Sequence, residues 1–406
     1  MIKLALRNCL RNTKRTVITG LSILVAVLIV IICMSFMFSC IDDMIDNERN
    51  FTIGDIRIRT EKYSEYESLM PLQFYIEDYD ALKEALLKQN GVKSVESASR
   101  VYGSLYTDGT LKTVSVIAAD PGSVYIGDRT IIKEGRLLNE GKRELMATPR
   151  FLEEYGLSVG DSVTIIFRTA GGGTNAATFT IVGAVGYDSA EYNGSLAIVS
   201  SSMLSEVMHM DGGALEVHVW LEDGVDPALM AERLSSALDI DGLEIKGWKE
   251  ISSIYPILPL YKVMIGIVII LFFFIASTLV FNTMMMSTLE RKKEISTMIA
   301  LGFSRSYVII LLVVEGLIIS LISSSLAAAI GKALVEFYGH HGLDLTPFGA
   351  DAVEGWGFPN ILYTHLSSYL YLAVVAIEVA VSAAASYLAT KRVRRLEVAE
   401  ALREEA

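Results

Sequence analysis

The chain has 406 residues and a formal net charge of −12 at pH 7, and 52% of its residues are hydrophobic. Residues 41–260 hold 35 acidic and 19 basic side chains, a balance of −16, so the rest of the chain carries +4. An acidic segment of this kind argues against nucleic acid as a partner. Because long uncharged apolar stretches flank it, the composition indicates a membrane protein that carries a soluble domain.

Four apolar runs are long enough to cross the roughly 30 Å hydrocarbon core of a bilayer as helices. The third run is interrupted only by Glu315 and the fourth only by Glu378. The first run is too long for a cleaved signal peptide, whose apolar core has roughly 7–15 residues, so we expect an uncleaved anchor. We place the four spans at residues 17–40, 261–289, 307–331 and 366–390.

The basic residues near the spans predict their orientation. Residues 1–16, 290–306 and 391–406 are rich in Lys and Arg. In residues 332–365 the only Lys or Arg is Lys332, and several residues are acidic. We therefore expect three cytoplasmic segments, with both termini among them. Residues 41–260 and the loop 332–365 are then expected on the outer side of the inner membrane.

The acidic segment between the first two spans has the pattern of an α+β domain. Residues 55–59 alternate as a half-buried strand does, and helical periodicity predicts helices over Tyr79–Gln89 and Pro227–Leu238. A strand is also expected over Leu243–Gly247. Gly171–Gly173 resembles the flexible tip of a hairpin more than a phosphate-binding loop.

We divide this domain into a core, residues 41–201, and a second subdomain, residues 202–250. All three cysteines precede residue 41, so no disulfide is expected in the domain. No spacing of His, Cys, Asp or Glu predicts a metal site. His209 and His218 are isolated, and we expect them to be surface or packing residues.

The segment 290–306 between the second and third spans predicts a short amphipathic helix. Ile295, Met298, Ile299 and Gly302 fall at i, i+3, i+4 and i+7 and so share one face. Gly302 is well placed to end the helix. Such a helix can lie against the membrane or insert into a groove of a partner, and periodicity leaves both open.

Several sequence motifs carry a resemblance to one family. The domain resembles the MacB-type periplasmic core at Gly91-Val92-x-x-Val95, Gly135-Arg136 and Val159-Gly160-Asp161. The ending Arg395-Leu396-Glu397-Val398-Ala399-Glu400-Ala401-Leu402-Arg403 and the pair Glu315-Gly316 fit FtsX-like permeases, although that family usually has Pro where this chain has Val398. The loop is similar to their coupling segment over Glu290-Arg291-x-x-Glu294-Ile295-x-x-x-x-Ala300-Leu301-Gly302-x-Ser304-Arg305. With its order of span, large domain and three spans, the chain resembles the permease subunit of an FtsX/MacB-type ABC transporter.

The resemblance implies a mechanism. A separate cytoplasmic ATPase, which holds ATP and Mg²⁺, docks on the loop after the second span, and its closing moves helices that continue over residues 41–50 and 251–262. This chain has no Gly-x-x-x-x-Gly-Lys-Ser/Thr sequence, so we expect a non-catalytic subunit with no cofactor of its own. Within this segment we assign docking of the ATPase to Arg291, Glu294, Ile295, Met298, Leu301 and Gly302.

Several functions fit this layout. A mechanically coupled permease would release lipoproteins, as the LolC/LolE branch does, or would export peptides or antimicrobials. An FtsX-like subunit would instead regulate an extracytoplasmic hydrolase, and a ligand-sensing receptor would have no ATPase. The resemblance implies that the permease works as a pair, either with a second copy or with a related chain.

Two ionisable residues are expected inside the bilayer. Glu315 and Glu378 are costly there, so each is a candidate for function, for example in a proton relay. The favoured expectation is that each carboxyl is neutral, or is hydrogen-bonded between helices to a residue such as Ser277, Thr278 or Asn282.

Overall fold

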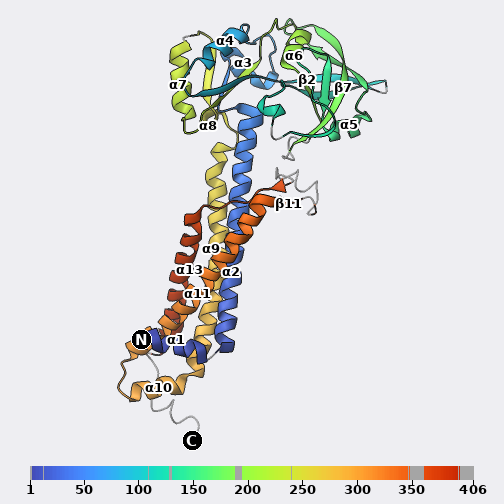
Figure 1. Ribbon diagram of the computed structural model, residues 1–406. Helices are drawn as coiled ribbons and strands as arrows, with labels where there is room; N and C mark the ends of the chain where they lie inside the picture. The colour runs from blue at the N-terminus through green and yellow to red at the C-terminus, as the bar shows by residue number, and fades with distance from the viewer. Residues whose placement is uncertain are drawn as a thin grey trace. The chain divides into compact units, whose positions relative to one another are not determined.

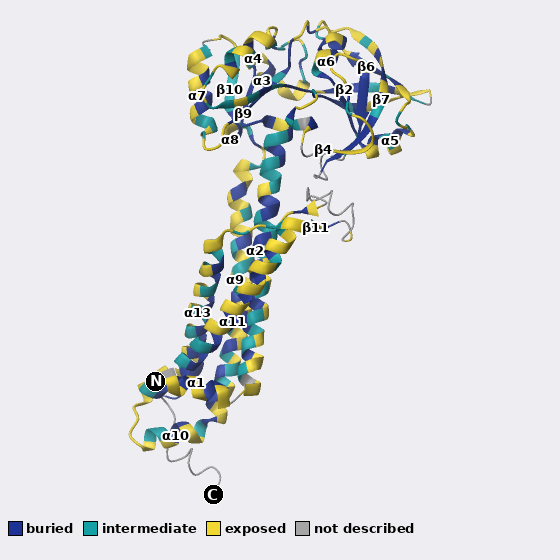
Figure 2. Cartoon of the chain, viewed as in Figure 1, coloured by how far each residue is buried: buried dark blue, intermediate teal, exposed yellow. Residues whose placement is uncertain are grey.

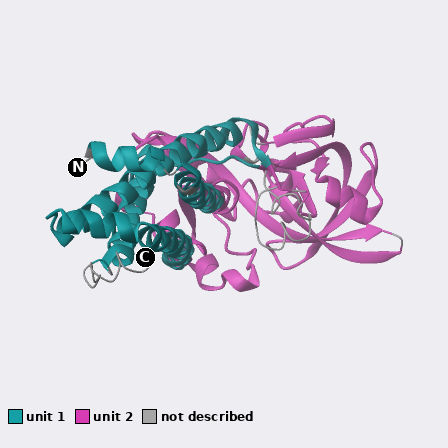
Figure 3. Ribbon diagram, turned by 90° about the horizontal axis from the view of Figure 1, so that it is seen from below, with its two compact units in different colours: residues 1–41, 258–343, 362–406 teal, residues 42–257, 344–361 magenta. Residues whose placement is uncertain are grey.

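The chain forms two compact units in the computed structural model, which describes residues 2–11, 13–107, 109–127, 130–187, 194–238, 240–345, 347, 361–391 and 393. Unit 1 comprises residues 1–41, 258–343 and 362–406, and unit 2 comprises residues 42–257 and 344–361 (Figure 3). The motif expected at residues 395–403 lies outside the described residues, as does most of the stretch 346–360.

Unit 1 is built from long apolar helices (Figure 1). Among the described residues, four helices are long and apolar enough to cross a membrane, and they cover Thr16–Ile53, Tyr255–Glu290, Arg305–His341 and Ser368–Thr390. The helices of the bundle are α1 (Ile2–Arg11), α2 (Thr13–Glu48), α9 (Leu258–Glu290), α10 (Lys292–Ala300), α11 (Arg305–His341) and α13 (Ser368–Thr390).

Two of these helices continue well past the ends of their apolar runs. α2 runs to Glu48, where a π-helical turn, Arg49–Ile53, follows it, and α11 runs to His341. The 36 residues of α2 would span about 54 Å at 1.5 Å per residue, more than the roughly 30 Å of a hydrocarbon core. α2 is therefore longer than the hydrocarbon core requires, and the last residues of the helix are rich in aspartate.

Small residues let the helices of unit 1 approach closely. A Cβ added at Gly331 of α11 would lie 2.9 Å from Cγ2 of Ile31 in α2. A Cβ at Gly316 would lie 2.3 Å from the hydroxyl of Ser386 in α13, so α11 packs tightly on both neighbours. Much of the outer surface of these helices is exposed, as Figure 2 shows, and only 22% of the most apolar 18-residue stretch within Tyr255–Glu290 is buried.

Unit 2 is built on a ten-stranded mixed sheet in its described part. The strand order is β10-β1-β9-β2-β3-β8-β5-β7-β4, and β6 pairs with both β2 and β7. Its strands are β1 (Ile56–Thr60), β2 (Val92–Thr107), β3 (Thr110–Ala118), β4 (Thr130–Gly135), β5 (Glu144–Ala147), β6 (Ser162–Arg168), β7 (Thr174–Tyr187), β8 (Leu196–Val199), β9 (Glu216–Leu221) and β10 (Leu243–Gly247). Its α-helices are α3 (Glu61–Glu65), α4 (Tyr79–Leu87), α5 (Pro149–Tyr155), α6 (Ser201–Met208), α7 (Pro227–Leu238) and α8 (Trp248–Ile251).

Short-range signals explain where several of these helices begin and end. Thr148 caps α5 by accepting a hydrogen bond from the backbone N–H of Phe151, and Pro149 follows in the first turn. The helix ends at Gly156, whose φ of 63° lies in the left-handed region that glycine tolerates. Ser200 caps α6 in the same way. Side chains of both helices pack in one apolar core of unit 2.

The division of the domain at residue 202 is wrong. β9, α7 and β10 lie with β1 and α4 from the start of the domain, and their apolar side chains form one core. α6, by contrast, contributes to the core of the other subdomain, with α5 and β7. The long strand β2 belongs to both, because its first half pairs with β9 and its second half with β3 and β6. Strand pairing brings together segments far apart in sequence, which a division by sequence position misses.

The expectation of a half-buried strand at residues 55–59 is also only partly right. β1 is present, but Arg57 and Arg59 on its polar face are 8% and 4% exposed. Ile56 and Ile58 fill the core on the opposite face. Both faces of this part of the sheet are therefore covered.

Candidate coupling site

The helix α10 is delimited by local sequence signals. At its end, Gly302 has a φ of 98°, and its N–H donates to the carbonyl of Ile299 at 3.0 Å. The N–H of Phe303 donates to the carbonyl of Met298 at 3.1 Å, which completes a Schellman motif. Ser304 then caps α11 through the N–H of Tyr307 at 3.2 Å. Helix, turn and helix are thus specified within a few residues.

The apolar face of α10 packs against its own chain. Ile295 is fully buried in the core of unit 1, and Met298 and Ile299 pack partly buried against that core. The two arrangements left open by periodicity were a membrane surface and the groove of a partner. Ile295 takes neither, because the bundle of unit 1 already covers it.

A buried ion pair anchors the start of α10. Arg291 Nη1 lies 3.0 Å from Glu315 Oε2 of α11, and the Arg291 and Glu315 side chains are 8% and 0% exposed. The same guanidinium donates through Nε to Glu294 Oε2 at 2.9 Å. Arg11 of α1 forms an ion pair with the other carboxylate oxygen of Glu294. Residues from α1, α10 and α11 therefore meet in one charged network.

The expected partners of Glu315 were wrong. Its carboxylate pairs with Arg291 rather than with a hydroxyl of α9. The hydroxyls of Ser277 and Thr278 donate instead to the carbonyl of Phe274 within their own helix, and both bonds are exposed. Arg291 lies just past the end of the predicted second span, in the segment 290–306 that the sequence predicts to be a cytoplasmic loop.

Glu378 has a different environment. It is fully buried in α13, and the hydroxyl of Ser382 donates to its Oε1 at 2.8 Å. A serine partner was expected, but this serine lies one turn along the same helix rather than on a neighbouring one. Glu378 Oε2 has no hydrogen-bond partner within the described ranges.

The environment of Glu294 keeps its carboxylate charged. Burial alone would raise the pKa of Glu294, but the hydrogen bond and charge of Arg291, together with the charge of Arg11, outweigh it and hold the pKa below its usual range. The Glu294 and Arg11 side chains are 46% and 56% exposed, so this outer pair is screened by solvent and is weaker than the pair beneath it.

The turn after α10 exposes apolar side chains. Leu301 is 75% exposed and Phe303 is 45% exposed, with Gly302 exposed between them. We call Leu301, Gly302 and Phe303 the α10 tip. Exposed apolar groups within a polar loop are typical of contact sites for another protein. Sequence reasoning omitted Phe303, although an aromatic residue directly after the helix-ending glycine was a usable signal.

The structure thus divides the six residues predicted for docking. Arg291 and Ile295 are buried and hold α10 on the bundle, while Glu294, Leu301 and Gly302 are exposed and Met298 is half-buried. Arg11 was not foreseen, because nothing in the sequence relates it to Glu294 across 283 positions. In the described part of the chain, no group of three or more His, Cys, Asp or Glu residues is arranged to hold a metal ion.

Two family models together cover most of the chain. The model of the MacB-like periplasmic core domain matches residues 16–237, and the model of the FtsX-like permease C-terminal region matches residues 266–398. The chain belongs to the FtsX/MacB family of ABC transporter permeases. The FtsX-like match includes α10, its tip and Glu315, so the anchored helix lies inside the permease module. Membership of this family implies a multi-pass membrane protein with an ABC ATPase as partner.

Solved structures resemble the domain of this FtsX/MacB-type permease. One is the periplasmic region of MacB from Actinobacillus actinomycetemcomitans, with 15% identity and a TM-score of 0.38 over 52% of this chain and 95% of that one. Another is the extracellular domain of the ABC-type transporter YknZ from Gram-positive bacteria, with 16% identity and a TM-score of 0.33 over 47% of this chain and 99% of that one. A comparison with curated protein sequences found no match.

Proposed function

We propose that this permease transmits the ATP-driven motion of a separate cytoplasmic ATPase to its α+β domain, and that the ATPase docks on the α10 tip. The observation that carries the proposal is the combination of a buried anchor and an exposed apolar end on one short helix. Arg291 and Glu315 fix α10 to α11, while Leu301 and Phe303 project at its end. The basic segments around the spans support a cytoplasmic location for this helix.

The anchor gives α10 the rigidity that force transmission needs. A buried ion pair resists separation because breaking it leaves charges in a low-dielectric interior. Ile295 adds packing in the core, and Arg11 braces the outer side through Glu294. A push on the α10 tip would therefore move α11 and α1 rather than bend the loop.

A cluster of hydrogen bonds joins the C-terminal end of α2 to the segment that leads into α9. Glu48, at the end of α2, accepts hydrogen bonds from the hydroxyl of Ser252 and from the N–H and hydroxyl of Ser253, the last two at 2.8 Å. Glu48 is 7% exposed. The segment that precedes α9 is thus tied to the end of α2. We call these contacts the Glu48 clamp, and we propose that it makes the two helices act together on the domain.

For the cargo, lipoprotein release is the first class to test, because the length and four-span layout resemble the LolC/LolE branch. A groove of about 570 Å³ in unit 2 supports an apolar cargo. Tyr66, Leu69 and Phe74 line it, together with Arg168. Such a groove would accept an acyl chain or an apolar peptide segment. Export of peptides or antimicrobials, and regulation of an extracytoplasmic hydrolase, are the alternatives for the same machine.

Co-purification of the ATPase tests the docking site. Leu301→Asp is expected to reduce the amount of ABC ATPase that co-purifies in mild detergent by about tenfold or more, because a charge would be placed at the centre of the contact. Leu111→Asp is the matched control, since Leu111 is 59% exposed in the hairpin of β2 and β3. Equal ATPase recovery from both variants would refute docking at the α10 tip. Glu294→Lys is a less specific test, because it also breaks two ion pairs within the chain.

A further inference from the structure

The polar face of the sheet in unit 2 gathers charges from strands far apart in sequence. Side chains on a strand alternate between faces, so Arg57 and Arg59 of β1 share one face. Arg57 pairs in register with His218 of β9, and Glu216 lies two residues before His218 on the same face. The opposite face carries the apolar core with α4 and α7. The buried layer on this face of the sheet is therefore polar, whereas the layer on the opposite face is apolar.

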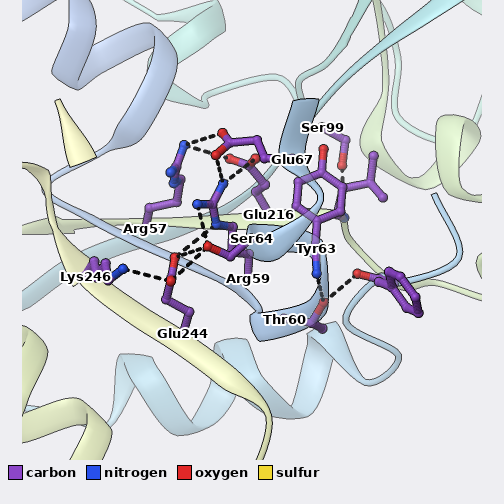
Figure 4. A network of polar contacts seen from close by, with 12 residues as sticks. Arg57, Arg59, Thr60, Tyr63, Ser64, Glu67, Ser99, Glu216, Glu244 and Lys246 are labelled. Carbon is purple, nitrogen blue, oxygen red and sulfur yellow. Dashed lines mark hydrogen bonds and ion pairs between the residues drawn. The ribbon is translucent and has the colours of Figure 1, made fainter. Parts of the chain in front are cut away.

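The segment after β1 covers this polar face (Figure 4). Glu67 comes from the turn that follows α3 and contacts both arginines. Its Oε2 lies 2.8 Å from Arg59 Nη1, and Arg59 Nε lies 3.1 Å from Glu244 Oε1. Arg57 is held less closely, at 3.4 Å from Glu67 and 3.9 Å from Glu216. Arg59 is therefore held by close ion pairs with Glu67 and Glu244, whereas Arg57 makes only longer contacts with Glu67 and Glu216.

A cavity of about 200 Å³ lies beside these charges. Its walls include two guanidinium groups, two carboxylates, a phenol and an imidazole, from Arg57, Arg100, Glu67, Glu216, Tyr63 and His218. Arg100 is exposed on β2, whereas Arg57 and His218 are buried. This volume is many times the roughly 10–15 Å³ that a single water needs, so the cavity has room for a small molecule.

His218 leaves hydrogen-bonding capacity unused in this cavity. It is 1% exposed, and neither ring nitrogen has a hydrogen-bond partner among the described residues. Its Nε2 lies 3.6 Å from Glu216 Oε2, which is too long for a hydrogen bond. Burial lowers the pKa of His218, so the neutral ring presents one donor and one acceptor. Buried polar groups of native proteins are nearly always satisfied, so these two atoms call for a partner.

We propose that this cavity binds a small zwitterion of amino-acid size. Its carboxylate would lie against Arg57 and Arg100, and its ammonium group against Glu67 and Glu216. A simple anion would face two carboxylates, and a simple cation would face two guanidinium groups. A molecule with both charges matches the walls, because each of its charged groups meets an opposite one. The ring of His218 would supply a further hydrogen bond to either end.

The position of the cavity connects it to the end of α2. Phe51 and Thr52, which belong to the π-helical turn after α2, also line the cavity. A bound ligand would contact this turn and stabilise one conformation of it. The inference goes beyond the proposed function, and binding itself requires no ATPase.

The test is a ligand screen on the full chain in lipid nanodiscs. Each of the common L-amino acids except Trp and Tyr is added at about 10 mM, and thermal unfolding is followed by tryptophan fluorescence, since a ligand of the folded state raises its stability. Trp220 is a suitable reporter because its ring lies 5.9 Å from that of His218. At least one amino acid is expected to raise the melting temperature and to bind saturably. Its N-acetyl and α-amide derivatives, which each lack one charge, are expected to bind about tenfold more weakly or worse.

Variants assign the binding to this cavity. Arg100→Ala is expected to weaken the affinity about tenfold without loss of folding, because Arg100 is exposed. Arg233→Ala, at an exposed position of α7, is the matched control and should bind as the wild type does. The proposal is overturned if no amino acid binds, if the two blocked derivatives bind equally well, or if Arg100→Ala leaves the affinity unchanged.

Discussion

Removing one partner of the Arg291–Glu315 pair perturbs the anchor of α10 most sharply. The two side chains are 8% and 0% exposed, so a single substitution leaves a buried charge without its counterpart. Breaking such a pair costs about 3–5 kcal/mol. In Glu315→Leu, the guanidinium keeps its 2.9 Å bond to Glu294, so we expect a loss near the lower end, about 3 kcal/mol.

The double variant Arg291→Met with Glu315→Leu distinguishes the stability lost with the ion pair from the stability lost with packing. Replacement of both charges by apolar groups of similar volume is often nearly neutral, so we expect the double variant to be more stable than either single one. The coupling energy of the cycle should be at least about 2 kcal/mol. Reversible unfolding in mixed micelles with increasing SDS measures each free energy. Additive losses, with no coupling energy, would refute the buried ion pair.

Three further predictions concern other parts of the chain. Burial raises the pKa of Glu96 to about 7. The contribution of this carboxyl to stability is therefore full below about pH 4.5 and is lost as the pH rises through 7. Thermal unfolding should show that Glu96→Gln stabilises the protein by up to about 3 kcal/mol at pH 8 and by little at pH 4. Gly302→Val forces a β-branched residue to a φ of 98°, which should cost about 1–3 kcal/mol and reduce ATPase co-purification, whereas unchanged stability would contradict the Schellman turn. Ser252→Ala with Ser253→Ala removes the two hydroxyls that bind Glu48, and the double variant should keep ATPase docking but lose cargo transport in vesicles; full transport would contradict the role of the Glu48 clamp.

Features set by neighbouring residues could be predicted from the sequence. The helix Pro227–Leu238 and the strand Leu243–Gly247 lie where periodicity places them. The helix-ending role of Gly302 is confirmed by its left-handed conformation. Each of these features depends on a few adjacent side chains and on backbone preferences, which a single sequence contains.

Features set by distant residues could not be predicted in the same way. Arg291 at the start of α10 pairs with Glu315 of α11, and Arg11 of α1 pairs with Glu294 across 283 positions. The burial of Arg57 and Arg59 requires Glu67 and α3 to fold over a strand whose alternation, taken alone, predicts one face open to solvent. Pairings of this kind depend on how strands and helices meet across the chain, and no local pattern encodes them.

Photo-crosslinking in native membranes tests docking at the α10 tip most directly. A photoreactive amino acid replaces Leu301, which is 75% exposed, and in a parallel variant it replaces Leu372 of α13, which is 73% exposed. We expect a covalent adduct with an ABC ATPase at position 301 and none at position 372. A correctly inserted protein that gives no ATPase adduct at position 301 would contradict the docking of the ATPase on this helix.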